Sequence, residues 1–134
     1  MKQIIEDYVS YEIAKLLKEK GFDEICSYIW GIPAINKGYV LQKWIITNRQ
    51  IKNSDLIEGA YTAPSQSLAL KWLREVHNLH ITIKPYITED GNMYLFEIYK
   101  LEAEKFTLIK TKTGFEKSEL ANEAALKYTL ENLI

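Results

Sequence analysis

The two histidines of the chain, His77 and His80, are the side chains best suited to acid–base or metal chemistry, and they lie three residues apart. On one continuous helix this His-x-x-His spacing can hold a metal ion. Asn78 stands between them, however, and asparagine commonly ends a helix. No cysteine lies nearby, so Glu75 or Asp90 would have to complete the ligand set. We therefore predict no metal site, and we place His77 in a last helical turn, where its charged form suits the helix dipole.

Two further patterns bear on catalysis. His80-Ile81-Thr82 matches the H-x-T element of two-histidine phosphoesterases, but their mechanism needs two such elements, one for the base and one for the acid, and the chain has one. Cys26 is the only cysteine, and a lone cysteine is more often a small core residue than a nucleophile. A fold that brought His77 or His80 to Cys26 would revive the hypothesis of an enzyme.

The sequence contains no Gly-x-Ser-x-Gly elbow and no glycine-rich nucleotide-binding loop. We therefore predict that the protein is not an enzyme, with no catalytic residue and no cofactor.

Composition is that of an average globular chain. The 134 residues include 17 Lys+Arg and 18 Asp+Glu, for a net charge of −1, and 47% are hydrophobic. These values exclude a disordered polyelectrolyte and a disulfide scaffold. The first residues lack the layout of a signal peptide, and no apolar run approaches the ~18 residues needed to cross a membrane. We expect a cytoplasmic protein without membrane contact, and near-neutrality argues against a broad phosphate-binding surface.

The elements that position these residues can be read from hydrophobic spacing. Ser10 is a suitable N-cap for a first helix that Gly21 ends. Residues 22–61 contain strand-like runs and are consistent with either a hairpin or an extended binding loop. Thr62-Ala63-Pro64 should open a second helix. Two alternating runs, 80–87 and 93–101, predict a hairpin, with Pro85 at either an edge position or a bulge.

A third strand at 106–111 and a final helix capped by Ser118 complete the pattern. The sequence thus predicts an α+β, two-layer domain over residues 1–134. It should contain an antiparallel sheet of three or more strands with helices packed on one face, in the order α-(β/irregular)-α-β-β-β-α. Residues 1–61 would form a helix plus an irregular or hairpin region, and residues 62–134 an α-β-β-β-α module. The predicted core comprises Trp72, Leu73, Val76, Ile81, Ile83, Phe96, Ile98, Leu120 and Ala124.

Aromatic residues are the most distinctive part of the composition, with nine Tyr and three Trp. Such side chains are enriched at binding surfaces, although they also fill cores. Several fall in the weakly periodic region, and loops on a rigid scaffold are where binding residues concentrate. The leading hypothesis is therefore a non-enzymatic protein that binds an unidentified protein partner. The predicted partner-binding residues are Tyr28, Trp30, Tyr39, Trp44, Tyr61 and Tyr86.

One stretch of the sequence has more basic than acidic residues. Its four lysines are the residues predicted to contact nucleic acid if the protein binds it: Lys105, Lys110, Lys112 and Lys117. The α-β-β-β-α order from Pro64 to Leu133 is similar to that of double-stranded RNA-binding domains. That resemblance implies a nucleic-acid-binding module as the alternative function. The family carries basic residues at the start of its final helix, whereas here Glu119 and Glu123 follow Lys117, so nucleic acid is not favoured as a partner.

A second resemblance covers most of the chain. Residues 16–24, 63–66, 71–81 and 131–134 resemble stretches of small uncharacterised proteins of gut-bacterial phages and integrated mobile elements. This resemblance implies a compact accessory protein carried by such an element, and it implies no activity.

Overall fold

The computed structural model describes residues 3–4, 6–31, 40–43 and 51–134. The chain divides into two compact units, Met1–Ser65 and Gln66–Ile134. The described residues form three α-helices and two antiparallel sheets, which confirms the predicted α+β class and element order. Among the helices described, we find none that combines the length and the apolar character needed to span a bilayer.

In the first unit, helix α1 spans Tyr11–Glu19. Ser10 caps it as predicted, because its side-chain oxygen accepts a hydrogen bond from the Ile13 N–H at 3.3 Å. Gly21 follows the helix with φ 91°, a left-handed conformation that favours glycine. The buried side of α1 carries Ile13, Ala14 and Leu17.

The sheet of this unit has the strand order β2-β1-β3, with β1 at Tyr28–Gly31, β2 at Val40–Lys43 and β3 at Tyr61–Thr62. β1 pairs antiparallel with both neighbours. The sequence was consistent with either a hairpin or an extended binding loop over residues 22–61. The antiparallel pairing of β1 with β2 agrees with the hairpin. A short 3₁₀ turn at Asn53–Asp55 lies between β2 and β3 in sequence.

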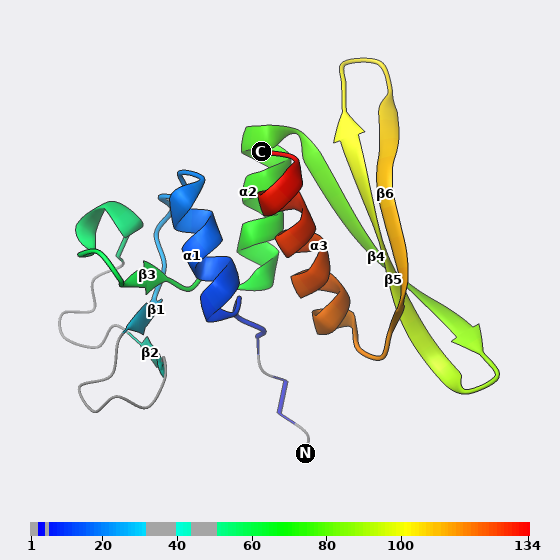
Figure 1. Cartoon of the computed structure of the whole chain (residues 1–134), viewed down its shortest axis with the longest axis horizontal. Helices are drawn as coiled ribbons and strands as arrows, with labels where there is room; N and C mark the ends of the chain where they lie inside the picture. The colour runs from blue at the N-terminus through cyan, green and yellow to red at the C-terminus, as the bar shows by residue number, and fades with distance from the viewer. Residues whose placement is uncertain (1–2, 5, 32–39, 44–50) are drawn as a thin grey trace. The chain divides into compact units, whose positions relative to one another are not determined.

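The second unit contains α2 at Gln66–His77, β4 at Leu79–Thr88, β5 at Gly91–Leu101, β6 at Phe106–Phe115 and α3 at Ser118–Asn132. Its strands lie in the order β4-β5-β6, so β4 and β6 are the edges. Figure 1 shows α2 and α3 side by side on one face of these long strands. Asn78 has φ 57° and ends α2 as predicted.

The core of the second unit matches most of the prediction. Trp72, Leu73, Ile81, Phe96 and Ile98 are buried, and Ile83 and Ala124 are half-buried.

The predictions for Val76 and Leu120 were wrong, since these side chains are 54% and 50% exposed. In α3 the buried stripe runs through Ala121, Ala125 and Thr129, one position later than the predicted Leu120 and Ala124. An amphipathic stripe read without its tertiary neighbours can be misplaced by one position in this way.

The predicted start of the second helix was also wrong. Thr62 belongs to β3, and the Pro64 carbonyl accepts a hydrogen bond from the Val9 N–H at 3.0 Å, so this segment closes the first unit. Helix α2 begins at Gln66, whose side-chain amide donates to the Glu119 carbonyl at 3.1 Å and accepts from Asn122 at 3.2 Å. Gln66 therefore joins the first turns of α2 and α3.

Candidate partner-binding face

One face of the second sheet is turned away from α2 and α3, and we call it the open face. Side chains alternate along a strand, so the residues that pair with buried Ile98 and Phe96 share the helix-covered side, and their neighbours point the other way. The register assigns these side chains to the open face: His80, Thr82, Lys84 and Tyr86 from β4; Met93, Leu95, Glu97, Tyr99 and Leu101 from β5; Phe106, Leu108 and Thr111 from β6.

A charged pair lies in the middle of the open face. Lys84 Nζ lies 2.6 Å from Glu97 Oε1, and the Tyr99 hydroxyl donates to Glu97 Oε2 at 2.9 Å. These bonds to Lys84 and then Tyr99 hold the pKa of Glu97 below its usual value. The same contacts raise the pKa of Lys84 and that of Tyr99. The positive charge of Lys84 and the negative charge of Glu97 therefore neutralise each other on this face.

Apolar side chains gather at the end of the open face next to the β5–β6 turn. Phe106 is 68% exposed and Leu108 47%, and the Phe106 ring meets Tyr99 edge-on at 5.5 Å between centroids. A shallow hollow of about 330 Å³ adjoins them. Its lining combines the apolar Tyr99, Leu101 and Phe106 with three polar side chains of β4: His80, Thr82 and Lys84. Such a mixture is typical of sites that anchor a ligand or a partner side chain.

The six aromatic residues predicted to bind a partner do not form one surface. Tyr28, Trp30 and Tyr61 are half-buried in the first unit. Tyr28 contacts Tyr8 ahead of α1, and the other two contact Tyr11, the first residue of that helix. Tyr8 lies 4.4 Å from Tyr28 between ring centroids, and the Trp30 indole donates to the Val9 carbonyl at 2.9 Å.

Tyr86, by contrast, lies on the open face of the second unit, in β4. Tyr39 and Trp44 lie outside the described residues.

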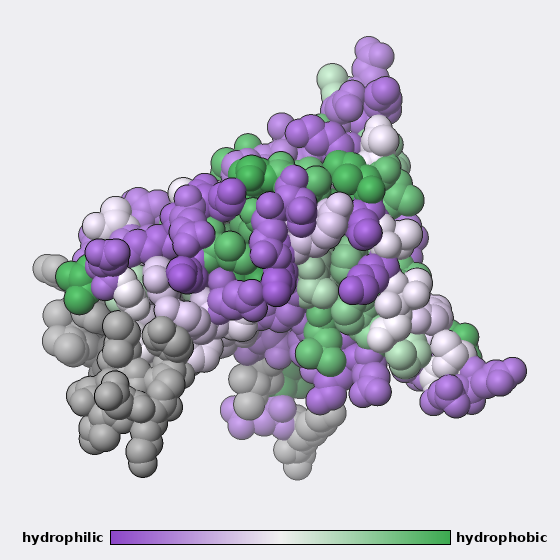
Figure 2. All heavy atoms as spheres, viewed as in Figure 1, coloured by the Kyte–Doolittle hydropathy of each residue, from purple (hydrophilic) through white to green (hydrophobic). Residues whose placement is uncertain are grey.

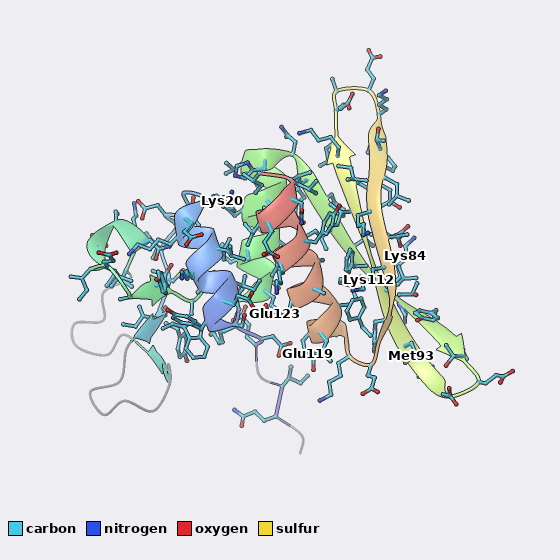
Figure 3. All side chains as sticks on the ribbon, viewed as in Figure 1. Lys20, Lys84, Met93, Lys112, Glu119 and Glu123 are labelled. Atoms are coloured by element: carbon cyan, nitrogen blue, oxygen red, sulfur yellow. The ribbon has the colours of Figure 1, made fainter. Side chains whose placement is uncertain are left out.

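The four lysines predicted for nucleic acid do not converge either. Lys105 precedes β6 and Lys117 follows it, so they lie at opposite ends of a strand roughly 30 Å long. Lys110 and Lys112 pair with Ile98 and Phe96 and so share the helix-covered side. Their ammonium groups lie over the rings of Tyr128 and Phe115, at 5.2 and 5.9 Å. Figure 3 shows Lys112 and Lys84 on opposite sides of the strands.

The two histidines are also separated by the sheet. His77, in the last turn of α2, lies edge-on to Trp72 at 4.7 Å, whereas His80 belongs to the open face. Burial and then the Lys100 charge lower the pKa of His77, so the prediction that its charged form is favoured was wrong. Within the described ranges, no three His, Cys, Asp or Glu side chains are grouped closely enough to hold a metal ion.

Cys26 is buried in the first unit. Burial raises the pKa of its thiol to about 11. A thiol in that state is almost entirely protonated at neutral pH, and the thiolate is the nucleophilic form.

Sequence reasoning missed the apolar end of the open face, although a signal for it was present. β5 has apolar side chains on both of its sides, with Phe96 and Ile98 toward the helices and Leu95, Tyr99 and Leu101 away from them. A strand that is apolar on both sides is typical of a sheet covered on both sides. The predicted hairpin with helices on one face did not use this signal.

Comparison with protein-family models, with curated proteins and with solved structures gives no significant match.

Proposed function

We propose that this chain is a non-enzymatic accessory protein that binds a partner protein through the open face of its second sheet. The observation that carries the proposal is the exposure of Phe106 and Leu108 next to the hollow that His80 and Tyr99 line. Aromatic and aliphatic side chains around a depression are the usual anchors of protein interfaces. The resemblance to small proteins of phages and mobile elements supports an accessory role in such an element.

The open face is a better candidate for the partner-binding surface than the predicted aromatic residues of the first unit, for a physical reason. Tyr28, Trp30 and Tyr61 already contact other side chains of their own unit, so little of their apolar area is left for a partner. Phe106, in contrast, exposes most of its ring. Covering an exposed phenyl group contributes about 1.5–3 kcal/mol.

Nucleic acid is the weaker alternative because of where the positive charge lies. Non-specific affinity for nucleic acid comes from many cations that contact phosphates at once. Lys105 and Lys117 are too far apart to act as one patch with Lys110 and Lys112. Lys117 directly precedes α3. Figure 3 shows Glu119 and Glu123 in the first turns of that helix, where they oppose the lysine's positive charge.

The test is differential capture from a lysate of the host cell. The wild-type protein and two variants serve as baits: Phe106→Ser on the open face and Ile57→Ser, an 81% exposed apolar residue of the first unit, as the matched control. We expect proteins that the wild type and Ile57→Ser capture and that Phe106→Ser loses. If Phe106→Ser captures the same proteins as the wild type, the proposal is wrong.

A second arm tests the alternative. Duplex RNA and duplex DNA are titrated at low and at high salt. Salt-sensitive binding that Phe106→Ser does not alter would favour a nucleic-acid function over the one proposed.

A further inference from the structure

The charges around the open face restrict what can cover it. The face itself carries Lys84 and Glu97, which neutralise each other. The β4–β5 turn at one end adds Glu89 and Asp90, and the β5–β6 turn at the other end adds Glu102, Glu104 and Lys105; all five are exposed. The open face and its turns thus hold five acidic side chains against two basic ones. Figure 2 shows hydrophilic residues at both tips of the sheet.

The edges of the sheet are unsuited to adding a strand from a partner. In β4, Pro85 lacks the N–H that a neighbouring strand would need. In β6, Lys110 and Lys112 lie mid-strand, and charged side chains on an edge oppose pairing with another chain. A partner must therefore cover the face rather than extend the sheet.

The dimensions of the face match one helix. Three strands set about 4.8 Å apart separate the edges by about 10 Å, which is close to the diameter of a helix. β5 has 11 residues and a length of about 35 Å, which a helix of about 23 residues would span from end to end.

From these observations, and resting on the proposed function, we infer that the partner presents a basic amphipathic helix of about 20 residues. Its apolar side packs on Tyr99, Leu101, Phe106 and Leu108, with one large side chain in the hollow that His80 and Thr82 line. Its Lys or Arg residues meet the acidic turns at the two ends of the sheet. A second copy of this chain fits poorly, because stacking two open faces would bring acidic turns near each other, and nucleic acid would meet the same repulsion.

The experiment measures binding of synthetic 20-residue peptides to the full chain by fluorescence anisotropy in about 0.15 M salt. The first peptide is a Leu/Ala/Lys amphipathic helix. The second peptide replaces every Lys with Glu. The third peptide is the first with its two central residues replaced by proline, which breaks the helix. We expect the first peptide to bind at least tenfold more tightly than either of the others.

Variants of the chain locate the binding. Phe106→Ser and, independently, Leu108→Ser should weaken binding of the first peptide at least tenfold. Glu102→Gln combined with Glu104→Gln should weaken it several-fold, and Ile57→Ser should leave it unchanged. Circular dichroism of each variant verifies that the chain is folded. No binding of the first peptide, equal binding of the Glu peptide or equal binding of the proline peptide would overturn the inference.

The same measurements separate this inference from the proposed function. If the Glu or proline peptide binds as tightly as the first and Phe106→Ser abolishes that binding, the helix inference fails while the open face stands as a protein-binding site. If a 20-nucleotide single strand competes with the first peptide at the open face and binds more tightly, the partner class is nucleic acid and both proposals fall.

Discussion

The hydroxyl of Tyr86 accepts a hydrogen bond from the backbone N–H of Gly114 at 2.8 Å. Tyr86 lies in the edge strand β4 and Gly114 in the opposite edge strand β6, so the bond connects the two edges across β5. Gly114 has φ 94°, at the point where the pairing of β5 with β6 is irregular. The bond therefore links the two edge strands at one of the two points where the pairing of β5 with β6 is irregular.

Replacing Tyr86 with Phe should destabilise the second unit by about 0.5–1.5 kcal/mol, the net contribution of one hydrogen bond whose donor can reach water when it is broken. Urea denaturation followed by circular dichroism measures the change. Because phenylalanine retains the ring and lacks only the hydroxyl, the packing around position 86 should not change. A free energy of unfolding equal to that of the wild type would show that the bond contributes nothing.

The pair formed by Lys84 and Glu97 should make stability depend on pH. The pKa of Glu97 is lowered in the folded chain, first by its bond to Lys84 and then by that to Tyr99. A carboxyl with a depressed folded pKa stabilises the fold above its unfolded pKa, and that stability is lost as the pH falls through the folded value. We therefore expect the urea midpoint to fall between pH 5 and pH 3.

Glu97→Gln is the matched variant, because the amide keeps the shape of the carboxylate and does not titrate. Its urea midpoint should change less than that of the wild type over the same pH interval. An identical pH dependence in both proteins would show that other carboxyls account for it.

Trp72 and Val76 test the assignment of buried and exposed sides in α2. Both were predicted to lie in the core, and the structure buries Trp72 but exposes Val76. Trp72→Ala should cost about 3–5 kcal/mol, because it removes a large buried side chain. Val76→Ala should change the free energy of unfolding by less than about 0.5 kcal/mol. Similar losses from the two variants would place Val76 back in the core.

The contrast between these residues indicates how far the sequence could predict the fold. Local rules were sufficient for the cap at Ser10, the end of α2 at Asn78 and the edge position of Pro85, because each depends on backbone chemistry within a few residues. Val76 is exposed although it lies at helical spacing from the buried Trp72 and Leu73. Its exposure depends on what packs against the last turn of α2, and no local pattern contains that information.

The candidate site was less predictable for a related reason. Aromatic content was used as the signal for a binding surface, yet Tyr28 and Trp30 meet partners from the segment around Tyr8 and Tyr11, which are remote in sequence. The lysines looked clustered in sequence, but alternation along a strand and the length of β6 separate them in space. Phe106 is exposed because no helix of its own unit covers that face, which only the topology reveals.

Asn53 should be the most sensitive polar residue of the first unit. Its side-chain amide donates to the Phe22 carbonyl at 2.8 Å, and its side-chain oxygen accepts from the Thr62 N–H at 2.8 Å. Asn53 and both of these partner residues are buried. Asn53→Ala would leave two buried backbone groups without these bonds, and we expect a loss of about 2–4 kcal/mol.

The control for Asn53 is Lys52→Ala, one residue earlier on the exposed side of the same turn. It should leave the free energy of unfolding nearly unchanged. Chemical denaturation of both variants, followed by tryptophan fluorescence, measures the difference. Equal stabilities would mean that Phe22 and Thr62 find other partners.

Cys26 offers a chemical measure of whether the first unit stays folded. Its thiol is buried, with Sγ 3.6 Å from the Glu24 carbonyl oxygen, and its pKa is raised to about 11 by burial. Because only the thiolate reacts with iodoacetamide, alkylation at pH 8 should be much slower in the folded chain than in 6 M urea. Asn53→Ala should accelerate it, since loosening the turn between β2 and β3 exposes the segment that pairs with Cys26 at Ile51. Mass spectrometry at timed intervals gives both rates. Alkylation of the folded wild type as fast as that of the unfolded chain would mean that Cys26 is accessible, and it would reopen the nucleophile hypothesis that burial now opposes.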